Sequence, residues 1–357
     1  MSAPSDLTLG DFTLQVAPYE LVATAFVGEF SIVHRCRDDS LRRDVAVKAV
    51  RPDGIDVALA RRCALVEARV RASVAHPHVL PLFQLIVPDE ENILLVGPWL
   101  SHGSLADLEL RPVSAAQAVA LADALGGALD ALHAAGWWHG DLSPGNVLFA
   151  TAPGDDASPG DPVLADFGTA RRVGTHALSD GTIVATPQVT APEVWSGRPA
   201  DGRADLYGLG VLLYHALVGG WPFDAADPSV AAELHRHAAV PRPSVGPNVD
   251  SVLLRALAKS PAERFPTGAA LAAALREGMR ADGLLSEDSP PRRPAPRTAD
   301  ARERGDTVVA AGERLEEFAA SLDPQARSAL RVLLRRSAAV EARAWHEIGR
   351  ASCRERV

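Results

Sequence analysis

The secondary-structure pattern of this 357-residue chain changes near residue 100, and that change restricts the possible folds more than any other feature. Residues 12–50, 79–87 and 92–97 contain short runs rich in β-branched residues, which predict strands. Within this first part, residues 56–75 carry apolar side chains at helical spacing. Later helices are predicted at 114–135, 205–219, 229–239 and 249–276. A strand-rich front and a helix-rich back predict an α+β protein with two lobes.

Charge and cysteine content exclude several other classes of protein. The chain has 36 basic and 45 acidic residues, a formal net charge of −9, so we expect no sequence-independent binding to nucleic acid. Its three cysteines have neither metal-site nor disulfide spacing, which fits a reducing cytoplasm. The first residues show no signal-peptide pattern, and no uncharged apolar run reaches the roughly 18 residues of a membrane helix.

Four short motifs follow one another along the chain. Lys48 ends the strand-like run Val-Ala-Val-Lys, and His-Gly-Asp-Leu-Ser-Pro-Gly-Asn occupies 139–146 after a long helix. Asp-Phe-Gly then occupies 166–168, and Ala-Pro-Glu occupies 191–193. Each motif alone is common by chance, but their order and spacing resemble the signature set of protein kinases. The resemblance is to bacterial, actinobacterial-type eukaryotic-like Ser/Thr kinases and extends to about residue 280.

This resemblance implies a fold and an activity. We expect a bilobal protein-kinase-like fold, with a small β-rich N-lobe and one main helix in residues 1–99 and a larger helical C-lobe in residues 100–282. The implied reaction is Mg-ATP-dependent phosphorylation of Ser/Thr hydroxyls on protein substrates, the chain itself among them. Such a transfer has a loose transition state, so catalysis is mainly positioning and neutralisation of charge. We expect the kinase domain to be cytoplasmic.

The resemblance also assigns catalytic roles to five residues. Lys48 would hold the α- and β-phosphates, and Glu67 on the neighbouring helix would hold Lys48. Asp141 would accept the proton of the substrate hydroxyl. Asn146 and Asp166 would bind Mg²⁺ through oxygen atoms, the ligands that this hard cation prefers.

Further positions are assigned to binding of the nucleotide. The implied contacts are Gly28, Val33, Ala46, Lys48, Gly97, Trp99 and Asp166. At the junction of the lobes, the Gly97 carbonyl and the Trp99 N–H are expected to contact adenine. Of the three glycines in the family's phosphate-covering loop, the middle one remains as Gly28, while Phe26 and Ser31 stand at the outer positions.

Four more residues resemble structural parts of the family. Glu193 and Arg264, which lies in the segment Ala-Lys-Ser-Pro-Ala-Glu-Arg-Phe-Pro, would form a buried ion pair in the large lobe. Asp205 would hold the backbone of the catalytic loop. His139 is expected to order this loop rather than act as a base.

Two departures from the family pattern leave alternatives open. Ser143 stands where Ser/Thr kinases usually carry a lysine, which predicts a slow chemical step, and Gly140 replaces an arginine that commonly pairs with a phosphate on the activation loop. One alternative is a nucleotide-binding pseudokinase that acts as a regulatory or scaffold module. A second is a small-molecule phosphotransferase, which would share the His-Gly-Asp motif and Asn146 but lack the Ala-Pro-Glu segment and the Arg264 partner.

The end of the chain differs in composition from the rest. Residues 283–306 are rich in Pro and Arg and predict a disordered linker, and residues 307–346 regain helical periodicity. Residues 347–357 resemble a translated sequencing adapter, so we interpret them as an artefact and 307–346 as a truncated helical segment. The natural protein is then expected to continue, which leaves its membrane attachment open.

Overall fold

An antiparallel sheet of five strands forms most of the first hundred residues in the computed structural model of the chain. The sheet has the order β3-β4-β5-β7-β6. Its strands are β3 (Tyr19–Val27), β4 (Ser31–Asp38), β5 (Arg43–Val50), β6 (Gln84–Ile86) and β7 (Leu94–Pro98). A separate two-stranded sheet, β1 (Asp6–Leu9) with β2 (Phe12–Gln15), precedes it.

The structure describes residues 6–9, 12–15, 19–28, 31–50, 57–87, 92–107, 112–154, 160–175, 186–225 and 227–286. These residues belong to one compact unit. The linker predicted at 283–306 lies outside the described residues from 287 onward, and so do the helical segment predicted at 307–346 and the adapter-like tail at 347–357.

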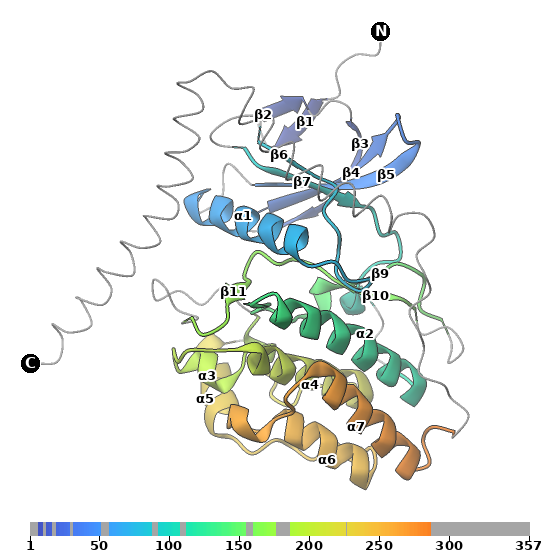
Figure 1. Cartoon of the computed structure of the whole chain (residues 1–357), viewed down its shortest axis with the longest axis vertical. Helices are drawn as coiled ribbons and strands as arrows, with labels where there is room; N and C mark the ends of the chain where they lie inside the picture. Colours follow the sequence, from blue (N-terminus) through green and yellow to red (C-terminus); the bar gives the residue numbers. More distant parts are fainter. Residues whose placement is uncertain are drawn as a thin grey trace, which may run out of the picture. The chain divides into compact units, whose positions relative to one another are not determined.

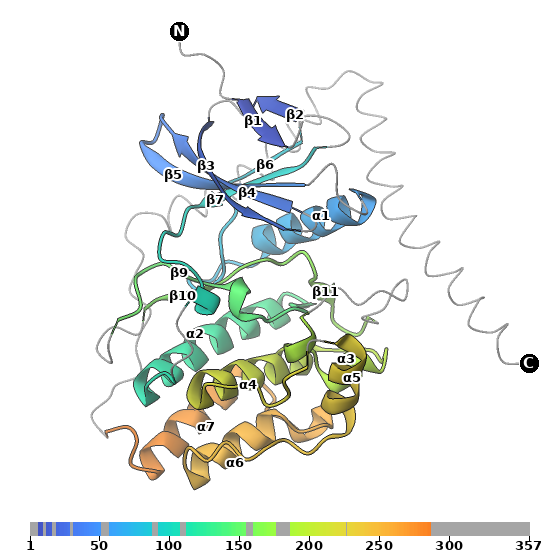
Figure 2. The same cartoon turned by 180° about the vertical axis from the view of Figure 1, so that it is seen from behind.

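The two faces of the sheet bury different sets of side chains. Along β4 and β5, buried and partly buried residues alternate, as the two-residue period of a strand requires. One face forms a core of Tyr19, Ile32, Cys36, Val45, Val47, Ala49, Leu94 and Val96. The helix α1 (Val57–Ser73) packs on the other face, where the core comprises Val50, Ala60, Ala64, Ala68, Ile93 and Leu95. In both views α1 lies between the sheet and the helical part of the chain (Figures 1 and 2).

The second part of the unit is built around α2 (Ala115–Ala134) and α4 (Gly202–Val218). Ser114 and Gln117 start α2 with a reciprocal capping box, in which each side chain bonds the backbone N–H of the other residue. The remaining helices are α3 (Pro192–Trp195), α5 (Pro228–His237), α6 (Pro247–Ala256) and α7 (Gly268–Ala281). Among the described residues, α2 is the one helix long and apolar enough to cross a membrane. It packs instead as a core helix, with Leu125, Leu129 and Leu132 fully buried.

Short elements connect these helices and carry the motifs. The strands are β8 (Trp137–Trp138), β9 (Val147–Phe149), β10 (Pro162–Leu164) and β11 (Arg171–Arg172). The single-turn helices are η1 (Leu105–Asp107), η2 (Pro144–Asn146), η3 (Pro187–Val189) and η4 (Pro261–Glu263). Strand β9 pairs with β10, and β8 pairs with β11.

The structure confirms the predicted α+β class with a β-rich N-lobe and a helical C-lobe, and it corrects two element boundaries. The predicted helix at 249–276 is two helices, α6 and α7, because Pro261 and Pro266 interrupt the helical backbone between them. The predicted strand at 79–87 is shorter, since it begins at Gln84 and Val79 makes one isolated bridge to Leu164.

Candidate active site

Lys48 lies between two carboxylates that come from distant parts of the sequence. Its Nζ atom, on β5, is 2.7 Å from Oε2 of Glu67 on α1 and 2.7 Å from Oδ1 of Asp166, which follows β10. Burial alone lowers the pKa of Lys48, but the charges of Asp166 and Glu67 outweigh burial and raise this pKa above its ordinary value. The ammonium group is therefore held charged.

Asp166 has an unusual backbone conformation. Its φ is 55°, in the left-handed region that non-glycine residues rarely adopt. Its Oδ1 atom also accepts a hydrogen bond from the Gly168 N–H at 3.3 Å. Burial favours the protonated carboxyl, but the charge of Lys48 prevails and lowers the pKa of Asp166. Strain of this kind is often found at functional sites.

Asp141 and Asn146 lie on one loop and contact each other. Nδ2 of Asn146 donates to the Asp141 carbonyl at 2.9 Å and to Oδ2 of Asp141 at 3.1 Å. The other carboxylate oxygen of Asp141 accepts a 2.8 Å bond from the backbone N–H of Thr186, just before η3. The carboxylate is thus oriented from two sides. Thr186 lies five residues before the Ala-Pro-Glu motif at 191–193.

Asp205 on α4 fixes the backbone of this loop through hydrogen bonds. The two Asp205 oxygens accept hydrogen bonds from the N–H groups of His139 and Gly140, at 2.8 and 3.0 Å. The fully buried His139 ring contacts the Ala165 carbonyl through Nε2 at 3.1 Å. Asp205 therefore lies where the sequence predicts it, and His139 ties the loop to the segment that leads to Asp166.

Gly140 meets a backbone requirement of its own. Its φ is +85°, and an added Cβ atom would lie 2.9 Å from the carbonyl oxygen of Thr169. Both facts favour glycine at this position. The loss of the family's arginine here is therefore compatible with the local geometry.

Several residues predicted to bind nucleotide project from a single face of the sheet. Val33 pairs with Lys48, and Ala46 pairs with Gly97, in neighbouring rows of the register. Residues directly opposite each other in an antiparallel pair point to the same side. This face is the one covered by α1. Gly28 follows β3 and donates its N–H to the carbonyl of Ser31 at 2.8 Å.

The backbone at Gly97 argues against one predicted contact. The Val96 carbonyl accepts a hydrogen bond from the Phe83 N–H at 2.8 Å, so the polar groups of Val96 face β6. Because these groups alternate sides along an antiparallel strand, those of Gly97 face β5. The Gly97 carbonyl is thus turned into the sheet and away from a bound adenine. Trp99 follows the last paired residue, Pro98, and its predicted contact through N–H stays a prediction.

The oxygen atoms of Asn146 and Asp166 suit a hard divalent cation. Asn146 uses its Nδ2 atom for the bonds to Asp141, and Asp166 uses Oδ1 for Lys48 and Gly168. Within the described residues, no hydrogen bond occupies the Asn146 Oδ1 or the Asp166 Oδ2 atom. Magnesium commonly uses one or two protein oxygens together with water and phosphate oxygens, so this donor set fits.

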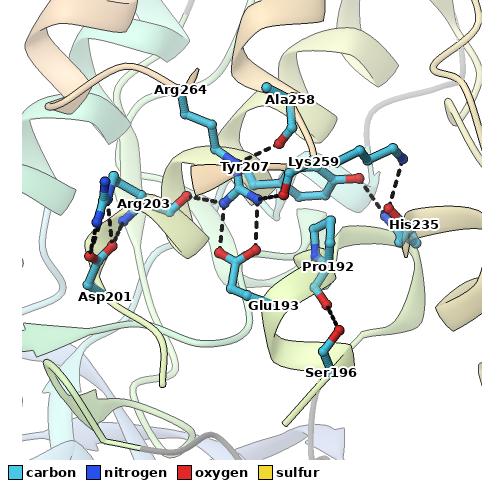
Figure 3. Close-up of polar contacts among 10 residues, drawn as sticks. All are labelled: Pro192, Glu193, Ser196, Asp201, Arg203, Tyr207, His235, Ala258, Lys259 and Arg264. Carbon is cyan, nitrogen blue, oxygen red and sulfur yellow. Dashed lines mark hydrogen bonds and ion pairs between the residues drawn. The ribbon is translucent and has the colours of Figure 1, made fainter. Parts of the chain in front are cut away.

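A buried ion pair joins Glu193 to Arg264 in the helical part (Figure 3). The Nη1 and Nη2 atoms of Arg264 each lie 2.7 Å from one carboxylate oxygen of Glu193, so the ion pair is bidentate. Arg264 also donates to the carbonyls of Arg203 and Ala258, each at 2.8 Å, and lies over the Tyr207 ring. The arginine is 3% exposed and Glu193 is 7% exposed. The predicted partners are therefore in contact.

A comparison with known protein families matches residues 20–274 to the protein kinase domain. The chain belongs to the protein kinase family. The matched range runs from β3 into α7 and includes Lys48, Glu67, Asp141, Asn146 and Asp166.

Relatives of this chain include three serine/threonine-protein kinases of Mycobacterium tuberculosis. PknK is 32% identical over 271 residues, which cover 74% of this chain and 24% of PknK. PknJ is 33% identical over 293 residues, which cover 78% of this chain and 48% of PknJ. PknD is 32% identical over 275 residues, which cover 74% of this chain and 40% of PknD. The chain thus spans between a quarter and a half of the length of these relatives, and the predicted resemblance to bacterial Ser/Thr kinases is confirmed.

Arg71 is a charged residue of this site that belongs to none of the sequence motifs. Its guanidinium is buried and donates to the free oxygen of Glu67, Oε1, at 3.0 Å. Four arginines occur on α1, and Arg71 alone stands four residues from Glu67, the spacing of a helix ion pair. A second signal is Gly97, a glycine inside an apolar strand, which often marks a close approach by another group.

Lys259, the second of the two lysines in the sequence, supports a different part of the fold. Its Nζ atom donates to the carbonyls of His235 and Leu234 at the end of α5, at 2.8 and 3.3 Å (Figure 3 shows the first contact). The ammonium also lies 4.4 Å from the centre of the Phe223 ring. Burial, aided by the charge of Arg264, lowers the pKa of Lys259 to about 8.

This lowered pKa predicts a pH-dependent stability. Between about pH 8 and the ordinary lysine value of 10.5, the unfolded chain binds more protons at Lys259 than the folded chain does. Stability rises with pH wherever the unfolded state binds more protons. We therefore expect the urea midpoint of the wild type, relative to Lys259→Met, to rise across this range. Parallel pH profiles for the two proteins would show that Lys259 titrates normally.

Proposed function

We propose that this chain is a Mg-ATP-dependent Ser/Thr protein kinase, with its N-lobe in residues 1–99 and its C-lobe in residues 100–282. The observation that carries this proposal is the placement of Lys48 between Glu67 and Asp166, with 2.7 Å to each. The Asp141–Asn146 contact supports it, and so do the names of the relatives, which are serine/threonine-protein kinases.

In this proposal the chain's residues first bind and orient ATP. Lys48, held by Glu67, donates to the α- and β-phosphates from a rigid strand. Val33 and Ala46 contact the base from the sheet face that they share. Asn146 and Asp166 hold Mg²⁺, which neutralises phosphate charge when bound. Asp166 would hold the metal through Oδ2, because its Oδ1 atom is the one that contacts Lys48.

Asp141 is the proposed base for the substrate hydroxyl. As the hydroxyl oxygen of Ser or Thr bonds to the γ-phosphorus, its proton moves to the Asp141 carboxylate. The bond between this phosphorus and the β–γ bridging oxygen breaks, and ADP leaves with that oxygen. The N–H of Thr186 and the amide of Asn146 keep the carboxylate aimed during the transfer.

Ser143 is the feature that makes the proposed reaction slow. Within the described part of the chain, the polar partners of Asp141 are neutral groups, including Asn146 and the Thr186 N–H, and none is a cation. Loss of one preorganised stabilising group costs roughly 10²–10³ in rate in other enzymes. A chain that binds nucleotide but transfers no phosphoryl group would be the pseudokinase alternative.

Mg-ATP is expected to stabilise the folded wild-type chain and to transfer labelled phosphate to Ser or Thr of a generic protein substrate. At a ligand concentration of 100 times Kd, binding adds about 2.7 kcal/mol of stability by mass action. Lys48→Ala should reduce both the rise in melting temperature and the transfer, because the phosphates lose their cation. Lys259→Ala, the matched loss of the other lysine, should keep the nucleotide-dependent rise. An unchanged wild-type melting temperature at saturating Mg-ATP would contradict the proposal.

A further inference from the structure

Arg71 is a buried cation that shares Glu67 with Lys48. Its Nη1 atom donates to Oε1 of Glu67 at 3.0 Å, while Lys48 contacts Oε2 at 2.7 Å. Its Nη2 atom donates to the Pro81 carbonyl at 2.6 Å. The Arg71 and Glu67 side chains are 3% and 2% exposed. The two oxygens of one buried carboxylate are thus each assigned to a different cation.

The chain leaves room for this guanidinium by placing glycine at position 97. A Cβ atom added to Gly97 would lie 2.3 Å from Nη2 of Arg71 and 3.0 Å from the Pro81 carbonyl oxygen. The guanidinium cannot move aside without losing its bonds to Glu67 and Pro81. Gly97 and Arg71 therefore form a matched pair, in which the absent side chain on β7 accommodates the charged end of a side chain from α1.

The Pro81 contact connects this pair to the strand that precedes Asp166. Pro81 follows Leu80, whose N–H donates to the Leu164 carbonyl at 2.9 Å on β10. Asp166 is the second residue after the end of β10. Arg71 thus links the Glu67 carboxylate to the same backbone that anchors the start of the Asp166 segment.

The charges of this group balance. Arg71 and Lys48 supply two cations, and Glu67 and Asp166 supply two carboxylates. A carboxylate bonded by Lys48 alone could rotate when Lys48 engages phosphate. Because Arg71 binds Oε1, only Oε2 is available to Lys48. The orientation of the Glu67 carboxylate is thus fixed before any ligand binds. A buried charge that loses its partner is strongly destabilising, so Arg71 and Glu67 are expected to stay paired.

We propose that Arg71 is a positioning residue, which holds Glu67 so that Lys48 is directed at the phosphates, and that Gly97 is required to admit it. This inference rests on the proposed function, because it assigns Lys48 to ATP. In this proposal the positive charge of Arg71 orients Glu67, and an uncharged side chain of the same volume would not.

The test separates charge from volume in the full chain. Arg71→Leu combined with Gly97→Thr replaces the lost side-chain volume without the cation, and Arg71→Lys keeps a cation. Gly97→Ala keeps every charge but displaces the guanidinium. The readouts are kcat/KM for ATP, the melting temperature, and the ¹⁵Nζ resonance of Lys48. That resonance is one of two lysine signals in a chain with two lysines, and Lys48→Ala assigns it.

We expect the double variant to keep a melting temperature near that of the wild type while kcat/KM falls about tenfold, the order of one lost hydrogen bond to a charged group. Its Lys48 resonance should shift, and Arg71→Lys should lose less activity than the double variant. Wild-type kcat/KM and an unshifted Lys48 resonance in the double variant would overturn the proposal and reduce Arg71 to a space-filling role.

Two further outcomes are decisive. If the double variant does not fold, Gly97→Ala gives the answer, since the proposal requires it to lower kcat/KM and to shift the Lys48 resonance, and wild-type values would refute it. If the wild type shows no turnover above Lys48→Ala, the proposed function fails. The Lys48 resonance then still decides whether Arg71 positions Glu67.

Discussion

Replacing Asp141 by asparagine is expected to eliminate phosphate transfer to Ser and Thr. The substitution keeps the size of the side chain but removes the group that accepts the hydroxyl proton. A positioned general base typically contributes about 10²–10⁴ in rate. The new amide also places an NH₂ group against either the Thr186 N–H or the Asn146 Nδ2 atom, both of which are donors to Asp141. One orienting hydrogen bond is therefore lost together with the charge.

The measurement is incorporation of label from γ-³²P-ATP by the full chain, with and without a generic protein substrate. Asp227→Asn serves as the matched control, because Asp227 caps α5 on an exposed surface and asparagine is an equally good cap. We expect Asp227→Asn to keep wild-type incorporation. Equal incorporation by wild type and Asp141→Asn would remove the enzyme proposal and leave the nucleotide-binding pseudokinase.

The sequence was sufficient to predict the fold class, and the resemblance assigned Glu67 as the partner of Lys48. The family's motifs occupy fixed places in its fold, with the lysine on a strand and the glutamate on the neighbouring helix. The order and spacing of the motifs along the sequence therefore predict which of these side chains come into contact. Lys48 lies 2.7 Å from Glu67, the partner that the resemblance assigns to it, whereas its 2.7 Å contact with Asp166 was not among the expectations.

Strand register and tertiary packing determine the features that the sequence did not predict. The direction of the Gly97 carbonyl depends on which neighbour each residue of β7 bonds, and one position along the strand reverses it. Arg71 has one partner at local helix spacing, Glu67, but its second partner is the Pro81 carbonyl on the chain after α1, which no local pattern encodes. Two prolines mark the break between α6 and α7. The sequences on both sides have helical periodicity, so the two helices were predicted as one.

Replacing Arg264 by alanine is expected to be the most destabilising of these substitutions. Glu193 would remain buried without a cation, and breaking one side of a buried ion pair typically costs about 3–5 kcal/mol. The carbonyls of Ala258 and Arg203 would also lose their donor. The expected result is a large fall in the urea midpoint of the full chain, measured by circular dichroism. A midpoint equal to that of the wild type would contradict the importance of this pair.

Two comparisons make this result specific to the buried pair. Arg236→Ala removes an arginine from the exposed Arg236–Glu233 pair on α5, and surface pairs contribute only about 0–1 kcal/mol. Its urea midpoint should stay close to that of the wild type. A fall as large as that of Arg264→Ala would show that loss of arginine in general, and not burial of the pair, causes the effect.

Replacing both partners tests whether the stranded charge is the main cause. Glu193→Leu with Arg264→Met leaves no buried charge, so we expect it to be less destabilised than Arg264→Ala. It should not reach the wild type, because Arg264 donates to three backbone carbonyls besides Glu193, those of Arg203, Ala258 and Lys259. Those carbonyls come from α4 and from the turn between α6 and α7, and an apolar side chain leaves them unpaired. A double variant as unstable as the single one would place the whole cost in these carbonyls instead of the Glu193 charge.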